Sequence, residues 1–196
     1  MIQNIKGMTD DERIEAISQR FGEIIELLGE DTQREGLLKT PMRAAKSMWY
    51  LTSGYRANAE ETLQSAIFEH CGSQVVTVKD IEFYSLCEHH VLPFFGHVSI
   101  AYVPGKNIVG LSKLARAVDI CARKLQVQER LTREIAEAVY DALAPEGVLV
   151  VVNAHHLCMK MRGVEKQDAS TETIDARGVF ATDNQLRAET LGRLRQ

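Results

Sequence analysis

The sequence lacks the features that mark membrane and secreted proteins. Its longest purely aliphatic run, residues 148–152, is far too short to cross a bilayer. Residues 1–15 are polar, carry acidic side chains early and have no apolar core of the kind that a signal peptide needs. These absences predict a cytoplasmic protein with no membrane partner.

The chain also lacks an excess of positive charge. Its 23 basic and 27 acidic residues give a formal net charge of −4, which argues against nucleic acid as the main partner. It has no GxxxxGK motif, so a bound nucleotide would not be held by a P-loop. Because thiols stay reduced in the cytoplasm, we do not expect disulfides among its cysteines, which are Cys71, Cys87, Cys121 and Cys158.

What the sequence does contain is a helical first third. Residues 9–12 (TDDE) form a capping-box pattern, and apolar residues then follow a helical spacing from residue 14 to residue 28, where Gly29 ends the run. Thr40 and Pro41 indicate a second helix start, with Thr40 as the cap, and this helix continues to about residue 53. We predict an N-terminal helical extension over residues 1–66.

From about residue 75 the pattern changes to strands and later returns to helices. Alternating or β-branched stretches predict strands at 74–78, 94–103 (with a possible bulge at Gly96), 148–153 continuing toward 161, and 170–180. Amphipathic stretches predict helices at 113–125, capped by Ser112, at 129–143, and a short one from Asp183. Strand hairpins with helices between them predict an α+β domain over residues 67–196.

Cysteine and histidine cluster in two short segments, residues 87–90 (CEHH) and 155–158 (HHLC). Cys87 and His90 are close enough in sequence to bind one ion, and Cys158 could add a third ligand from a separate element. If only one of these segments were present, a buried cysteine beside surface histidines would be a better interpretation than a metal site. Two such segments in a cytosolic chain favour a metal site, and thiolate with imidazole favours zinc.

The spacing leaves the type of metal site open. If residues 156–158 were extended, His156 and Cys158 would share a strand face, and both could bind together with Cys87 and His90 as a closed structural site. Three ligands and a spare histidine would instead make a catalytic site.

A basic segment suggests a phosphate-binding site. Residues 106–133 contain seven basic and two acidic residues within a chain of net charge −4. Lys113 and Arg116 lie three apart at a predicted helix start, where cations and free N–H groups favour anions. Glu129 could accept two hydrogen bonds from a guanine edge, although a glutamate at a helix start is usually only a dipole partner.

Several uninterrupted blocks resemble the GTP cyclohydrolase I family: residues 83–90 (FYSLCEHH), 110–116 (GLSKLAR), 126–132 (QVQERLT) and 156–159 (HLCM). The resemblance also covers residues 40–46 and 161–164, and it extends from about residue 40 to residue 180. It implies the tunnelling fold, in which an antiparallel sheet carries two helices on one side. It also implies a homodecamer of two stacked pentamers with active sites between subunits.

The activity implied by the resemblance is zinc-dependent conversion of GTP and water to 7,8-dihydroneopterin triphosphate and formate, the first step of tetrahydrofolate and pterin biosynthesis. By motif position, the zinc ligands are Cys87, His90 and Cys158, and the catalytic histidines are His156 and His89. The substrate-binding residues implied in the same way are Glu129, Gln128, Ser112, Lys113, Arg116, Arg162 and Arg43.

One residue departs from the family pattern, and two other classes of protein compete with this interpretation. His155 stands where many relatives have a small polar residue, and strand alternation turns it away from His156, so we expect it to be non-catalytic. A zinc nucleoside deaminase would need H-x-E and P-C-x-x-C motifs, which the chain lacks. A zinc-stabilised binding or scaffold protein would have a closed four-ligand site and would release no formate from GTP.

Overall fold

A computed structural model describes residues 5–69, 72 and 74–195 of the chain. These residues form two compact units, with the division between Thr52 and Ser53. The first unit therefore ends 14 residues before the predicted end of the helical extension, because helix α3 (Ala59–Gln64) packs against helices of the second unit. The predicted boundary between residues 66 and 67 stays a prediction.

The first unit consists of a short 3-10 helix η1 (Ile5–Gly7) and two α-helices, α1 (Asp10–Leu27) and α2 (Thr40–Leu51). The capping box predicted for α1 is present: the Glu12 amide donates to Thr9 Oγ1, and the Thr9 amide donates to the Glu12 carboxylate at 2.7 Å. The prediction that Thr40 caps α2 is wrong. Lys39 is the N-cap, and the Thr40 hydroxyl donates instead to the Gly36 carbonyl.

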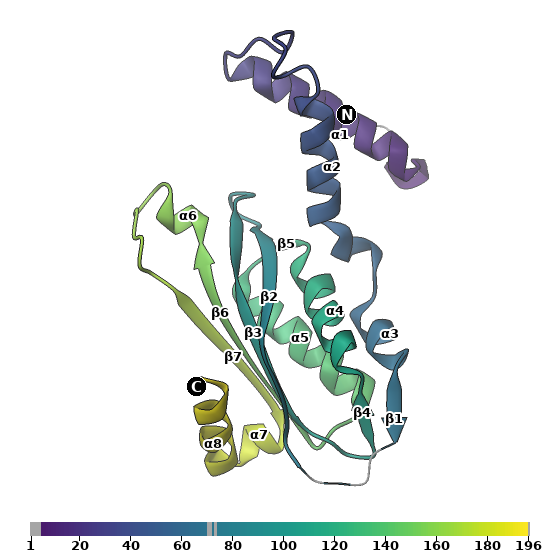
Figure 1. Cartoon of the computed structure of the whole chain (residues 1–196), viewed down its shortest axis with the longest axis vertical. Helices are drawn as coiled ribbons and strands as arrows, with labels where there is room; N and C mark the ends of the chain where they lie inside the picture. Colours follow the sequence, from purple (N-terminus) through teal and green to yellow (C-terminus); the bar gives the residue numbers. More distant parts are fainter. Residues whose placement is uncertain (1–4, 70–71, 73, 196) are drawn as a thin grey trace. The chain divides into compact units, whose positions relative to one another are not determined.

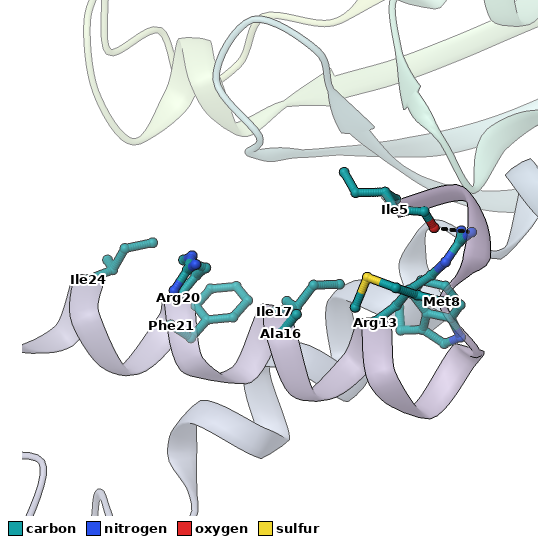
Figure 2. A pocket seen from close by; sticks show the side chains of 9 residues that line it. Ile5, Met8, Arg13, Ala16, Ile17, Arg20, Phe21 and Ile24 are labelled. Atoms are coloured by element: carbon teal, nitrogen blue, oxygen red, sulfur yellow. Dashed lines mark hydrogen bonds between the residues drawn. The ribbon is translucent and has the colours of Figure 1, made fainter. Parts of the chain in front are cut away.

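Much of the apolar surface of α1 is uncovered within this unit. Ser18 is the buried residue of α1, whereas Leu27 and Leu28 are 86% and 78% exposed. Figure 2 shows side chains along α1 that line an apolar pocket of about 310 Å³. The residues that line it are Ile5, Met8, Arg13, Ala16, Ile17, Arg20, Phe21, Ile24 and Trp49. A helix with so little of its apolar side buried is typical of one that packs against another chain.

The second unit is built on a five-stranded sheet in the order β5-β2-β3-β6-β7 (Figure 1). Its strands are β2 (Val76–Cys87), β3 (Pro93–Val103), β5 (Leu125–Gln126), β6 (Gly147–His156) and β7 (Thr171–Gly178). All neighbouring pairs are antiparallel except β2 with the two-residue β5. Two further strands, β1 (Ile67–Glu69) and β4 (Asn107–Val109), pair with each other.

Helices cover both faces of this sheet. Helices α4 (Leu111–Ala122) and α5 (Gln128–Leu143) pack on one face and bury the alternate residues Phe94, Val98, Ile100 and Tyr102 of β3. On the other face lie α7 (Val179–Thr182) and α8 (Asn184–Leu194). Phe180 of α7 and Leu194 of α8 form a second buried cluster there with Ala101 and Val103 of β3 and Leu149 and Val151 of β6. The structure thus confirms an α+β fold with an antiparallel sheet and two helices on one side.

Two local predictions are corrected by the structure. Gly96 is not a bulge: it pairs regularly, and a side chain there would place Cβ 1.9 Å from the Asn153 carbonyl oxygen. The irregularity lies in β2 between Val78 and Ile81. Ser112 is not a cap, since α4 begins at Leu111, two residues before its predicted start, with Gly110 as its N-cap.

Among the described residues, no helix is both long enough and apolar enough to span a bilayer.

Candidate metal centre and active site

Cys87, His90 and Cys158 come together at one end of the sheet. Cys87 is the last residue of β2, and the tight turn after it is fixed by its amide, which donates to the Leu92 carbonyl at 2.8 Å. His90 lies in this turn with Nδ1 3.8 Å from Cys87 Sγ. One ligand atom from each of the three residues lies within 4.8 Å of those from the other two.

Residues 156–158 are not extended, so His156 and Cys158 do not share a strand face, as the closed-site alternative would require. Strand β6 ends at His156, and Cys158 lies in the single helical turn α6 (Leu157–Lys160). This change of backbone direction brings Cys158 to Cys87, while the His156 ring stacks on Phe94 with centroids 4.8 Å apart. The potential metal ligands that converge in the described chain are the three residues Cys87, His90 and Cys158, and His156 is not among them.

This donor set fits a zinc ion. At Zn–S and Zn–N bond lengths of about 2.3 and 2.0 Å, two ligands of a tetrahedral ion lie roughly 3.5 Å apart, close to the Cys87–His90 separation. Burial and the adjacent Cys87 thiol both raise the pKa of Cys158 in the metal-free protein, and zinc binding requires its thiolate form. Cys121 is different: burial raises its pKa to about 12, and it is a core residue of α4.

The three described cysteines, Cys87, Cys121 and Cys158, are free thiols, as the sequence predicts. The same prediction for Cys71 lies outside the described residues.

His156 is half-buried beside the cluster and is bonded to helix α5. Its Nε2 lies 2.8 Å from Gln128 Oε1. Burial lowers the pKa of His156, the negative charge of Glu129 opposes this shift, and His155 adds to it. The ring is therefore largely neutral at physiological pH and available to accept a proton.

His155 points to the other face of the sheet, as strand alternation predicts. Its Nδ1 lies 3.3 Å from the Ala169 carbonyl oxygen, and its ring lies beside Phe95 rather than Phe94.

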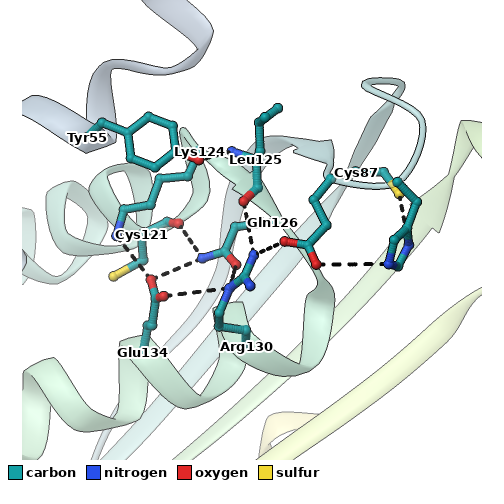
Figure 3. Close-up of polar contacts among 10 residues, drawn as sticks. Tyr55, Cys87, Cys121, Lys124, Leu125, Gln126, Arg130 and Glu134 are labelled. Atoms are coloured by element: carbon teal, nitrogen blue, oxygen red, sulfur yellow. Dashed lines mark hydrogen bonds and ion pairs between the residues drawn. The ribbon is translucent and has the colours of Figure 1, made fainter.

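His89 lies in the same turn as His90 and is exposed. Its Nε2 lies 3.9 Å from the Glu88 carboxylate, and Arg130 of α5 forms a short ion pair with that carboxylate. Figure 3 shows this connection from the turn to the helix. Sequence reasoning assigns no site role to Glu88 or Arg130, although both lie within the motif blocks.

Behind Arg130 a polar network fixes its guanidinium. Arg130 Nε donates to the buried Gln126 Oε1 at 2.7 Å, and Gln126 Nε2 donates to Glu134 at 3.0 Å. Glu134 also pairs with Lys124 at 3.1 Å (Figure 3). Arg130 and Glu134 are four residues apart on α5, and this spacing is the signal by which their proximity could have been predicted, whereas Gln126 lies in β5 before the helix.

The predicted phosphate-binding residues are not gathered in one chain. Ser112, Lys113 and Arg116 lie at the start of α4, whereas the end of α4 meets the Cys87 end of β2 through the Leu86 amide and the Lys124 carbonyl. Lys113 and Ala122 are nine positions apart along the helix, which is about 14 Å. Among the predicted residues of the second unit, Arg162 lies at the metal cluster, with Nη1 3.4 Å from His90 Nε2. Arg43 is exposed on α2 in the other unit.

Glu129 and Gln128 open helix α5 next to His156. Glu129 is exposed in the first turn, whereas Gln128 is only 2% exposed. Their side chains therefore have different surroundings: Glu129 can reach a ligand, and Gln128 is enclosed by the protein.

The fold and this site define a class of protein: an α+β chain with a three-ligand Cys-His-Cys cluster beside two further histidines. A family model described as GTP cyclohydrolase I matches residues 17–195. The chain belongs to the GTP cyclohydrolase I family, whose members are hydrolases.

Relatives of similar length support this membership. GTP cyclohydrolase 1 of Porphyromonas gingivalis is 54% identical over 176 residues, covering 88% of this chain and 91% of that one. The Bacteroides fragilis protein of the same name is 52% identical over 183 residues, with 93% and 94% covered. The Leptospira biflexa protein is 53% identical over 173 residues, with 88% and 94% covered.

A solved structure titled as the archaeosine synthase QueF-Like in the apo form is 20% identical, with a TM-score of 0.45 over 55% of this chain and 97% of that one.

Proposed function

We propose that the chain is a zinc-dependent enzyme that converts GTP and water to 7,8-dihydroneopterin triphosphate and formate, the first step of tetrahydrofolate and pterin biosynthesis. The observation that carries the proposal is the convergence of Cys87, His90 and Cys158 beside a separately held His156. Three protein ligands leave a coordination position for a reacting group, which a closed four-ligand site would not.

In this proposal each group has one role. Zinc, when bound by Cys87, His90 and Cys158, acts as a Lewis acid that lowers the pKa of a water molecule. His156 and His89 move protons to and from the guanine imidazole ring as it opens and C8 leaves as formate. The Glu88–Arg130 ion pair limits the movement of the turn that carries His89.

The triphosphate is proposed to bind Ser112, Lys113, Arg116, Arg162 and Arg43, and guanine is proposed to bind Glu129 and the adjacent Gln128. Since the α4 start and the metal cluster are far apart in one chain, this set supports an active site shared between subunits. A triphosphate of about four negative charges matches several cations from more than one chain.

Glu129→Gln is expected to weaken GTP binding by roughly 5- to 150-fold, because one acceptor facing a guanine donor becomes a donor itself. Zinc content should stay normal, since Glu129 is not in the cluster of metal-binding residues. Equilibrium binding of GTP to the zinc-loaded variant measures the effect. As a control, Glu137→Gln on the same helix should bind GTP normally. If Glu129→Gln bound GTP with unchanged affinity, Glu129 would only stabilise the helix dipole and would not bind guanine.

Assembly is part of the proposal: we expect a homodecamer of two stacked pentamers. The uncovered apolar side of α1 and the exposed edge of β7 in the sheet order both favour pairing with further copies. Light scattering at micromolar concentration should give about ten times the chain mass of 21.9 kDa. A stable and active monomer would contradict this prediction.

The experiment that tests the proposed function is incubation of the zinc-loaded protein with GTP. Formate release and the fluorescence of the oxidised pterin should rise together and should stop when a chelator removes the metal. If GTP is left intact by a fully metal-loaded protein, the chain is a zinc-stabilised binding protein instead.

A further inference from the structure

The side chain of Gln128 is fully engaged inside the protein. Its Nε2 donates to the carbonyl oxygens of Val152 at 3.0 Å and Thr171 at 2.9 Å, and it also lies 3.1 Å from Thr173 Oγ1. Carbonyl oxygens can only accept, so the nitrogen of the amide must face them. The amide orientation is therefore fixed, and its oxygen Oε1 must point the other way, toward His156.

A second set of hydrogen bonds holds this amide in place. The Thr132 hydroxyl donates to the Gln128 main-chain carbonyl at 2.8 Å, and Thr132 Oγ1 lies 2.6 Å from Thr173 Oγ1. Because the one Thr132 proton is used on the carbonyl, Thr173 is the donor in that contact. Helix α5 and strands β6 and β7 thus join at one buried amide.

The amide oxygen then determines which ring nitrogen of His156 carries a proton. Gln128 Oε1 can only accept, and it lies 2.8 Å from His156 Nε2. Nε2 must therefore be an N–H donor, and in the neutral ring Nδ1 is left with the free electron pair. Stacking on Phe94, with ring planes only 2° from parallel, holds the ring in this orientation.

We propose that Gln128 is a positioning residue that holds neutral His156 as the Nε2–H tautomer, so that Nδ1 is the atom that exchanges protons with the substrate. The proposal rests on the proposed function for the role of His156. It concerns the Gln128 side chain, whose amide hydrogen bonds described above are all made within the protein, so the contact of Gln128 with guanine proposed above would come from its main chain.

The direct test is ¹⁵N NMR of zinc-loaded protein labelled at histidine, at a pH of about 8, above the ordinary pKa of histidine. The His156 signals are identified by their absence from the spectrum of His156→Ala. We expect an N–H signal from Nε2 and a signal typical of an unprotonated nitrogen from Nδ1. A proton on Nδ1 with bare Nε2 would overturn the proposal. This measurement needs no turnover, so it is independent of whether GTP is the substrate.

The kinetic test is Gln128→Met, which keeps the side-chain length and removes the acceptor. We expect kcat for GTP to fall roughly 10- to 100-fold, the range for residues that orient a functional histidine, with little change in KM and full zinc content. In this variant the NMR signals of His156 should change to those of a mixture of tautomers. A raised KM with unchanged kcat would mean that the side chain binds substrate.

The control separates positioning from stability. Val139→Ala removes a fully buried core side chain from the same helix, about 16 Å along it from Gln128. It should lower the unfolding temperature without changing kcat or the His156 signals. Val139→Ala and Gln128→Met are compared at the same loss of unfolding temperature. If Val139→Ala then lowers kcat as much as Gln128→Met does, Gln128 has only a structural role.

Discussion

Cys158→Ser is expected to lose bound zinc and GTP turnover together. The three ligand atoms of Cys87, His90 and Cys158 lie within 4.8 Å of one another, so removing one thiolate leaves zinc with two protein ligands. Serine is a poor replacement because its hydroxyl stays protonated near neutral pH, where zinc requires a deprotonated ligand. Zinc per chain, measured by elemental analysis beside pterin formation, should fall toward zero along with activity.

A second cysteine supplies the matched control. Cys121 is buried in the core of α4, and Cys121→Ala should keep its metal and its turnover. If Cys158→Ser retained a full zinc equivalent, Cys158 would be a small buried residue near the metal rather than a ligand.

His156→Ala is expected to keep a full zinc equivalent and to lose turnover by roughly 10²- to 10⁴-fold, the usual contribution of proton transfer by a positioned side chain. The zinc should remain because Cys87, His90 and Cys158 are all present and the His156 Nε2 is committed to Gln128. Zinc analysis and single-turnover kinetics with GTP measure the two effects separately.

His155→Ala is the control for this variant, since its ring faces Phe95 and the Ala169 carbonyl on the other side of the sheet. It should change neither zinc content nor turnover. A metal-free His156→Ala would show instead that His156 is a fourth ligand, and the assignment of a catalytic role to it would be wrong.

The elements that the sequence predicts well are those specified by residues close together in the chain. The capping box at Thr9 and Glu12 is present, and α5 begins within one residue of its predicted start. The helix predicted from Asp183 is also present, with Asp183 as its N-cap. Apolar periodicity and caps act over one or two turns, so no distant contact is needed to read them.

Predictions failed where a neighbour in space determines the backbone. Residues 157–160 were expected to continue a strand, but β6 ends at His156 and one turn of helix follows. Gly96 is a possible bulge from the sequence, yet it pairs regularly and allows the close approach of the Asn153 carbonyl of the adjacent strand. The neighbouring segments that determine the backbone at residues 157–160 and at Gly96 cannot be identified from the local sequence.

The amino-acid sequence alone establishes which chemical groups this protein has: cysteine and histidine in two short segments, the carboxylates and cations around them, and an α+β order of elements. The tertiary structure decided which of these groups meet. His156 and Gln128 are 28 residues apart, Arg130 and Glu88 are 42 apart, and Arg162 and His90 are 72 apart. Contacts at such separations depend on strand register and helix packing, since a shift of one residue in a strand turns every side chain to the other face.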